Sequence, residues 1–327
     1  MPGPRMSDGI AERYRRFAVN EARGSSPVYE RLALAVAGSS DLVAFLASLP
    51  SERRQPNLFL AAVRHVAGVP RDGNEMQEIV RAHASRIKGI MLSRTTQTNE
   101  PGRCAVLLPV LARLKQPLAL IEVGASAGLC LLADRYGYDY GTHCLPPPPG
   151  PAVGPIFRCH ANAGTPLPPT LPQIGWRLGL DLNPLDVNSV DEMNWLETLV
   201  WPSQEQRARN LNAAIEIARA NPPKVRLGDL LTELPTLAAL APSNMQLVVY
   251  HTAVLGYVRS QSDRDEFAKA VGQSNALWIS NEAPFVFPDV AKAAPPPPNP
   301  GDFLLAVDKK PVAWTGPHGQ SIHWFAG

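Results

Sequence analysis

The sequence lacks any apolar stretch that is long enough to cross a membrane. Its longest apolar runs, 105–112 and 118–121, fall well short of the roughly 20 residues that a spanning helix needs. The region 8–23 is charged throughout and has no apolar core of the kind found in a secretory signal. We therefore expect a cytoplasmic protein that makes no contact with a membrane.

Cysteine is scarce, and neither sign of charge is in clear excess. The four cysteines form no C-x-x-C pair, so free thiols are expected in a reducing compartment. The 31 Lys and Arg residues nearly balance the 29 Asp and Glu residues, which leaves a net charge of +2. A protein that coats nucleic acid shows a much stronger basic footprint. We therefore expect no nucleic acid as a partner. The expected partner is a small-molecule substrate.

Proline is plentiful, with 34 residues, but a hydrophobic content of 45% is typical of a folded globular protein. A chain of 327 residues is long enough for one large domain or two modest ones. Residues 1–115 are rich in Ala, Leu and Arg at helical spacing, which predicts a helical N-terminal cap. Two roles are open for three arginines in this region: they contact an acidic group of a ligand, or they form a solvated helical face. These residues are Arg81, Arg86 and Arg94.

From residue 116 to residue 327 the pattern changes to an alternation of strands and helices. Short apolar runs that are typical of buried parallel strands occur at 118–123, 176–181, 225–227, 245–250 and 276–280. This alternation predicts an α/β fold with a Rossmann-like, doubly wound, mostly parallel sheet. We also expect a proline-rich insertion at 138–175 and antiparallel edge strands near the C-terminus.

The most informative segment is 121–129, where the first predicted strand runs into a turn of small residues, 124–128. As a nucleotide-binding turn, it would let a ligand approach the backbone and the start of the following helix. As a G-x-S-x-G elbow, it would expose Ser126 as a nucleophile, and a third possibility is a turn used only for packing. A hydrolase elbow follows several strands, whereas the region before it here is helical. The nucleotide-binding interpretation is therefore favoured.

A nucleotide-binding fold also needs an acidic residue at the end of its second strand, where a carboxylate accepts hydrogen bonds from the ribose. Asp181 occupies this position, with Asn183 just after it, and Asp229 follows the third strand. Glu122 and Asp181 are separated by about sixty residues instead of the usual ~20. The insertion must therefore leave the sheet and return.

These residues resemble the motifs of the class I S-adenosylmethionine-dependent methyltransferases. The series Glu122, Gly124, Ser126, Gly128 is similar to their glycine-rich first motif. Segments 179–184 and 228–229 are similar to their acidic ends of strands two and three. More closely, the chain resembles an uncharacterised bacterial family, domain of unknown function 2332, through segments spread over nearly its whole length: 97–100, 124–128, 134–136, 183–186, 201–202 and 251–253.

The methyltransferase resemblance implies S-adenosylmethionine as cofactor and methyl transfer to a small molecule. It implies a cofactor site formed by Glu122, Gly124, Ser126, Gly128, Asp181, Asn183 and Asp229. In that site Glu122 and Gly124 hold the methionine end, Asp181 the ribose and Asp229 the adenine. Two alternatives stay open, a serine hydrolase that uses Ser126 and a non-catalytic binding protein that kept the fold.

The fourth predicted strand departs from the methyltransferase pattern. It ends in Tyr250 and His251, where amino-directed enzymes have Asn/Asp-Pro-Pro-Tyr, so methylation of base nitrogens is disfavoured. His251 is a candidate general base for a hydroxyl or carboxyl nucleophile, because imidazole titrates near neutral pH. Its alternative is a hydrogen-bonded structural residue, and Tyr250 is a candidate for the pocket wall.

Two further groups of polar residues have more than one interpretation. Gln97, Thr98, Asn99 and Glu100 precede an apolar helix that begins near Arg103, and they either cap that helix or line the pocket. In the insertion, residues 143–144 and 159–160 form a mirrored His/Cys pattern. A zinc site is conceivable, but adjacent residues of a strand point to opposite faces, so we expect no metal.

Sheet geometry makes the firmest prediction. Gly124, Asp181, Asp229 and His251 each lie at the end of a different predicted strand. In an open parallel sheet, ligands bind outside the carboxyl ends of the strands, where the strand order changes direction. We therefore expect these four residues at one edge of the sheet, although they are scattered over about 130 positions.

Overall fold

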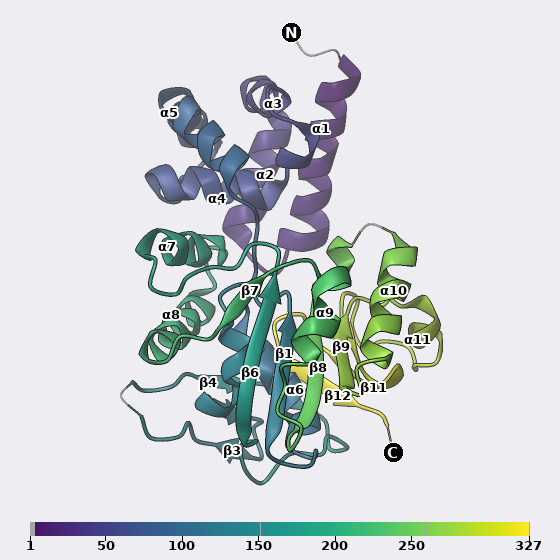
Figure 1. Ribbon diagram of the computed structural model, residues 1–327. Coiled ribbons are helices and arrows are strands. Elements are labelled where there is room, and N and C mark those ends of the chain that lie inside the picture. The colour runs from purple at the N-terminus through teal and green to yellow at the C-terminus, as the bar shows by residue number, and fades with distance from the viewer. Residues whose placement is uncertain (1–3, 151, 259, 327) are drawn as a thin grey trace. The chain divides into compact units, whose positions relative to one another are not determined.

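The structure is a computed structural model that describes residues 4–150, 152–258 and 260–326 (Figure 1). The chain forms two compact units. The first consists of residues up to 98 together with 194–209, and the second of 99–193 together with 210–327. Segment 99–115 therefore belongs to the second unit and not with the helices before it, and its helix packs against residues 129–135.

In the described part of residues 4–93, every regular element is a helix. Ser26, Ser39 and Asp72 cap three of the helices by accepting backbone N–H groups, as their residue types favour. Apolar side chains at helical spacing meet in one core, which includes Leu32, Phe59 and Trp195. The elements are α1 (Pro4–Phe17), η1 (Ala18–Ala22), α2 (Pro27–Gly38), α3 (Ser40–Ala47), η2 (Ser51–Arg53), α4 (Pro56–Ala67) and α5 (Gly73–Ser93).

The second unit is a mixed α/β structure built on a large, mostly parallel sheet, as predicted. Five neighbouring strands are parallel: β7 (Val225–Leu227), β6 (Ile174–Asp181), β1 (Leu118–Val123), β8 (Gln246–Thr252) and β9 (Leu277–Glu282). If these five strands alone are numbered from 1 to 5 in the order in which they occur along the chain, their order across the sheet is 3-2-1-4-5. The sheet continues through antiparallel β10 (Phe303–Val307), β11 (Lys310–Thr315) and β12 (Ser321–Trp324).

Helices cover both faces of the parallel strands, which explains why β1 is buried along its whole length. On one face, α9 (Leu230–Ala238) and α10 (Gln261–Gly272) contribute Leu234 and Phe267 to a core with Ile121 and Val249. In Figure 1, α6 (Cys104–Leu111) lies behind the sheet and α9 in front of it. The second unit also contains η3 (Pro101–Arg103), η5 (Leu255–Tyr257) and α11 (Pro288–Lys292), whereas α7 (Val190–Leu199) and α8 (Glu205–Ala220) each include residues of both units.

The helix predicted after β1 is not a regular α-helix. It is a 3-10 helix, η4 (Leu129–Arg135), and Gly128 before it has a left-handed backbone. The carbonyls of Leu129 and Ala133 accept hydrogen bonds from the hydroxyls of Tyr136 and Tyr138. These side chains satisfy carbonyls that an α-helix would bond to its own N–H groups.

The insertion has strands of its own. A small sheet has the order β3 (Cys144–Leu145), β2 (Gly137–Asp139), β4 (Ile156–Arg158). The next strand, β5 (His160–Ala161), pairs with β12, so the insertion and not the C-terminal segment forms that edge of the large sheet. The chain then returns, because β6 pairs directly with β1.

In the described ranges, no helix combines the length and the apolar character that a membrane span requires.

Candidate functional site

The carboxyl ends of the parallel strands form the candidate site. In the register of the sheet, Val123 lies beside Leu180 on one side and His251 on the other. Asp181 pairs with Leu227, so Asp229 follows two residues later at the same edge. The prediction that the four strand-end residues share one edge of the sheet is confirmed.

The turn after β1 is tied to the end of β6. Gly124 and Ala125 both donate their N–H groups to the carbonyl of Leu180, at 2.8 and 3.2 Å. The N–H of Ser126 donates to Oδ2 of Asp181 at 2.7 Å. These bonds hold the turn against the strand whose carboxylate was predicted to bind a ligand.

The two glycines of the turn are required by the chain's own packing. Gly124 has φ +72° and Gly128 has φ +74°. A Cβ on Gly124 would lie 2.3 Å from Val254 Cγ2, and one on Gly128 would lie 2.9 Å from Pro223. These are the uses expected of the first and third glycines of a nucleotide-binding fingerprint, a tight turn and close packing.

The middle position of the fingerprint, where the ligand would approach the backbone, is Ser126. It has φ +53°, a left-handed conformation that favours glycine, and it is 3% exposed. Its Oγ is buried and makes no hydrogen bond within the described residues. The side chain takes up space beside the turn, where the methyltransferase resemblance would place the methionine part of a cofactor, and Val254 covers Gly124 nearby. This end of the predicted cofactor site therefore fits poorly.

The adenosine end fits better. The carboxylate of Asp181 accepts the N–H of Asn183 at 2.7 Å in addition to that of Ser126, which fixes its orientation and leaves further lone pairs. Asp229 is exposed and caps α9 by accepting the N–H of Leu231. Leu182 and Leu227 adjoin these residues along the chain and are 67% and 69% exposed. Two carboxylates beside exposed apolar side chains suit a polar ribose with an attached flat ring.

Glu122 does not lie where a ligand would contact it. It is 2% exposed and pairs with Tyr250 on β8, which is fully buried. Burial raises the pKa of Glu122 well above its usual value, and the nearby Cys130 thiol raises it further. The predicted contact between Glu122 and the methionine end of a cofactor therefore has no geometric support.

His251 is also closed off from solvent, with 0% exposure. The indole N–H of Trp278 donates to Nε2 at 3.0 Å, and Nδ1 lies 2.7 Å from Oε1 of Glu282. Because Nε2 accepts, Nδ1 carries the proton and donates to the carboxylate. Glu282 also accepts the N–H groups of Val254 and Leu255. This arrangement favours the structural interpretation of His251 over the general base.

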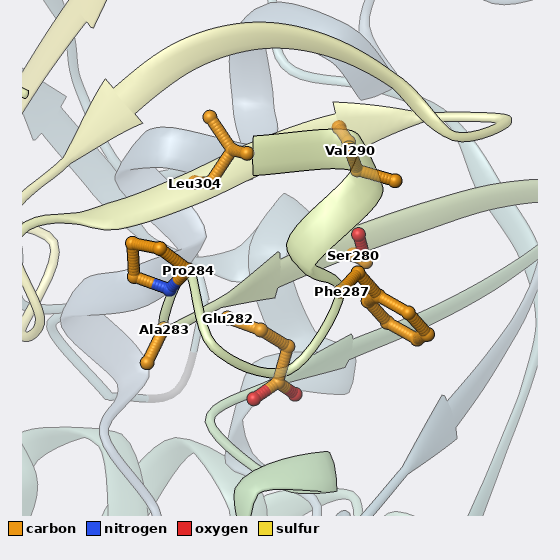
Figure 2. A pocket seen from close by; sticks show the side chains of 8 residues that line it. Ser280, Glu282, Ala283, Pro284, Phe287, Val290 and Leu304 are labelled. Carbon is orange, nitrogen blue, oxygen red and sulfur yellow. The ribbon is translucent and has the colours of Figure 1, made fainter. Parts of the chain in front are cut away.

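A small pocket lies at the carboxyl end of β9, between that strand, α11 and β10 (Figure 2). Figure 2 shows the carboxylate of Glu282 pointing away from Leu304 and Val290, so the walls are mainly hydrocarbon. The cavity volume is about 10 Å³, which leaves room for about one water molecule. By itself this pocket does not accommodate a cofactor.

The predicted polar run is divided between the two units. Gln97 and Thr98 belong to the first unit, whereas Asn99, Glu100 and Arg103 belong to the second. The 99–103 segment connects separate parts of the second unit. Asn99 Oδ1 accepts the N–H of Leu129 at 3.0 Å, just after the glycine turn. Arg103 donates to the carbonyls of Thr252 at 2.9 Å and Pro317 at 2.8 Å.

A residue that the sequence did not single out lies beside this segment. His318 is in the turn between β11 and β12, and its Nδ1 is 3.6 Å from Oε2 of Glu100. Glu100 is itself 8% exposed, and its Oε1 accepts the N–H of Gly102. More than two hundred positions separate His318 from Glu100, so no local spacing could have indicated the pair.

The other two chemical hypotheses find no assembled site. A serine hydrolase needs a base beside its nucleophile, and Ser126 Oγ has no hydrogen bond to a histidine within the described ranges. In the insertion, His143 Nε2 contacts the carbonyl of Pro168, and burial raises the pKa of Cys159 to about 12. Among the described residues, no three His, Cys, Asp or Glu side chains are grouped to hold a metal ion.

Comparison with known proteins identifies the family of this chain. Neither the curated proteins nor the solved structures contain a significant match. A family model, described as an uncharacterized protein conserved in bacteria (DUF2332), matches residues 11–324. The chain therefore belongs to the DUF2332 family.

Proposed function

We propose that this protein binds S-adenosylmethionine at the carboxyl edge of its parallel strands and transfers the methyl group to a small molecule. The observation that carries the proposal is the strand order 3-2-1-4-5, with β1 and β8 as neighbours where the order changes direction. Doubly wound sheets of this order bind nucleotide cofactors outside that point. The acidic ends of strands two and three, Asp181 and Asp229, lie at the same edge.

Asp181 and Asp229 would hold the adenosine half of the cofactor. The fixed carboxylate of Asp181 is suited to accept hydrogen bonds from the ribose hydroxyls, and Leu182 and Leu227 offer apolar surface to the adenine ring. When bound, S-adenosylmethionine supplies an electrophilic methyl carbon. The protein's contribution would be mainly proximity and orientation, which suffices when the acceptor arrives as a ready nucleophile.

Calorimetric titration with S-adenosylhomocysteine tests the proposal directly. We expect saturable binding by the intact chain and at least a tenfold weaker affinity in Asp181→Asn, because ribose would lose a charged acceptor. Asp289→Asn serves as a matched control, since Asp289 is an exposed carboxylate on α11 that pairs with Lys292. Absence of heat at millimolar ligand, or equal affinity in Asp181→Asn, would contradict the proposal.

Ser126 gives a second test at the methionine end. In Ser126→Gly the left-handed backbone is kept without strain and the narrowing side chain is removed, so we expect S-adenosylhomocysteine to bind several-fold more tightly. Ser126→Ala is the control, because it removes Oγ but keeps Cβ and the strained conformation. If Ser126→Ala gains as much affinity for S-adenosylhomocysteine as Ser126→Gly does, the left-handed backbone does not limit binding of the ligand.

One observation also favours a protein that binds the ligand without catalysis. His251, the base expected from the sequence, is fully buried and hydrogen-bonded at both ring nitrogens. A non-catalytic protein would bind S-adenosylmethionine and S-adenosylhomocysteine without consuming the former. Incubation with methyl-labelled S-adenosylmethionine and an extract of small metabolites separates the two, because only an enzyme produces labelled acceptor.

A further inference from the structure

A buried arginine lies at the carboxyl edge of the sheet, beside the end of β8. Arg103 belongs to the short helix η3, which precedes β1 in the sequence, and it is 6% exposed. Its Nη1 donates to the carbonyl of Thr252, the last residue of β8, at 2.9 Å and lies 3.5 Å from the hydroxyl of the same residue. Its Nε donates to the carbonyl of Pro317 at 2.8 Å. The guanidinium is therefore fixed at the edge where parallel sheets bind their ligands.

The positive charge of Arg103 is not neutralised by a carboxylate. A guanidinium keeps its charge in a protein and has five N–H donors. The two carbonyls that it contacts are neutral, and the ring of Phe303, with its centre 5.9 Å away, attracts the cation without cancelling the charge. Among the described residues, no carboxylate oxygen lies within 4 Å of its nitrogens and no hydrogen bond uses Nη2. A buried charge is unfavourable unless an opposite charge pairs with it, so Arg103 offers both charge and donors to an anion.

A second buried donor lies on the neighbouring strand. Asn281 is 0% exposed and pairs with Thr252 in the parallel register of β8 and β9. Residues that pair in this way project from the same face of a sheet, so the Asn281 side chain is on the face where the Thr252 hydroxyl adjoins Arg103. Its Oδ1 accepts the hydroxyl of Thr315 at 2.7 Å, whereas its buried Nδ2 makes no hydrogen bond within the described residues. An unsatisfied buried amide marks a place for a hydrogen-bond acceptor.

Two acidic residues adjoin these donors along the chain, and both are engaged by other groups. Glu282 follows Asn281 on β9, and because successive side chains of a strand alternate, it projects from the opposite face. There its Oε1 lies 2.7 Å from Nδ1 of His251. Glu100 Oε1 accepts the backbone N–H two residues further on, and neither of its oxygens forms an ion pair with Arg103. The protein's own carboxylates therefore leave this pair of donors to an external acceptor.

We propose that Arg103 and Asn281 bind the carboxylate group of a small-molecule substrate. Nη2 of Arg103 supplies the charge and Nδ2 of Asn281 a further N–H, and a carboxylate has only acceptor atoms to offer both. A carboxylate fits better than a phosphate, because its single negative charge matches one guanidinium, whereas a phosphate group carries about −1.5 to −2 at neutral pH. This site goes beyond the proposed function: it names the chemical class of the substrate, and it holds whether or not S-adenosylmethionine binds.

Binding of a carboxylate is tested with acetate as the probe, by thermal unfolding of the intact chain in sodium acetate and in sodium chloride at equal ionic strength. An anion that binds only the folded state stabilises it, so we expect about 100 mM acetate to raise the melting temperature by about 2 °C or more relative to chloride. Sodium phosphate at the same ionic strength should give a smaller rise. Equal melting temperatures in acetate and chloride, or a larger rise in phosphate, would overturn the proposal.

The variant Asn281→Asp tests the charge at the site. It places a carboxylate of the same shape beside Arg103 and keeps an acceptor for the Thr315 hydroxyl. We therefore expect a higher melting temperature than that of the wild type in chloride, and no further rise in acetate. Asn221→Asp is the matched control, because Asn221 is exposed and its replacement should leave the acetate response intact. A lower melting temperature in Asn281→Asp would overturn the proposal, since a buried carboxylate destabilises a site that has no positive charge to neutralise.

Removal of the charge completes the test. Arg103→Gln should abolish the acetate response, and an acetate response equal to that of the wild type would show that the anion binds elsewhere. If this variant does not fold, because two bonds to carbonyls are lost, Asn281→Asp still decides. Calorimetry with S-adenosylhomocysteine separates the two proposals. If acetate stabilises the chain but the nucleoside does not bind, methyl transfer fails and the carboxylate site stands; if the nucleoside binds and acetate has no effect, the carboxylate site fails alone.

Discussion

At the scale of single residues, the most unusual feature is a carboxylic acid buried in the sheet. Glu122 lies on the central strand with 2% exposure, and burial is the largest cause of its raised pKa. Its Oε2 makes no hydrogen bond within the described residues. A carboxyl in such surroundings is stable when protonated, and it destabilises the fold when it must ionise.

The pH dependence of stability follows from this shift. Because the folded state holds the proton of Glu122 more tightly than the unfolded state, stability falls as pH rises from the unfolded pKa toward the folded one. Each unit of elevation corresponds to about 1.4 kcal/mol. We expect Glu122→Gln to equal the wild type near pH 4 and to be more stable at pH 8, measured by urea unfolding. A constant difference between the two proteins at all pH values would contradict this mechanism.

At the scale of elements, the insertion is bound to the core by tyrosine hydroxyls. Tyr136, Tyr138 and Tyr140 are all 4% exposed or less. Their hydroxyls donate to the carbonyls of Leu129, Ala133 and Ala105, at 2.6 to 2.8 Å. The first two carbonyls belong to η4 and the third to α6, so tyrosines in and beside the small sheet satisfy polar groups of these two helices.

Removing one of these hydroxyls should destabilise the second unit. In Tyr136→Phe the carbonyl of Leu129 loses its donor in a buried site, which costs about 1–3 kcal/mol. Tyr257→Phe is the control, because Tyr257 is 76% exposed and should change stability by less than about 0.5 kcal/mol. Thermal unfolding followed by circular dichroism measures both. Equal melting temperatures for the two variants would show that the hydroxyl bond is not a stabilising link.

The sequence predicted the sheet better than the elements around it, and the reason is physical. Short apolar runs such as 118–121, which lies between Pro117 and Gly124 and is interrupted only by Glu122 before that glycine, are typical of a buried strand. The helix predicted after β1 is the 3-10 helix η4, whose carbonyls accept hydrogen bonds from Tyr136 and Tyr138 just beyond its end, a pattern that helical spacing alone does not indicate. In the candidate site, the apolar runs predict where the parallel strands end. The closure of His251 by Trp278 and the pairing of His318 with Glu100 depend on long-range contacts.

At the scale of the whole chain, the first unit is discontinuous in sequence. Its core contains Trp195, which is 2% exposed and donates its indole N–H to the carbonyl of Thr95 at 3.0 Å. Trp201 packs on Tyr29 with ring centres 5.8 Å apart. Arg64 donates to the carbonyl of Thr198 at 3.2 Å. The segment 194–209 is therefore part of this core and not merely a connection between strands.

A fragment experiment tests whether the N-terminal helices can fold without that segment. We expect a protein of residues 1–98 to show weak helicity and a broad thermal transition, because the positions of Trp195 and Trp201 in its core are left empty. Adding a peptide of residues 194–209 should sharpen the transition. The peptide with Trp195→Ala should not, since losing a buried tryptophan costs about 3–5 kcal/mol. A cooperative transition of 1–98 alone, unchanged by the peptide, would show instead that the helices form an independent domain.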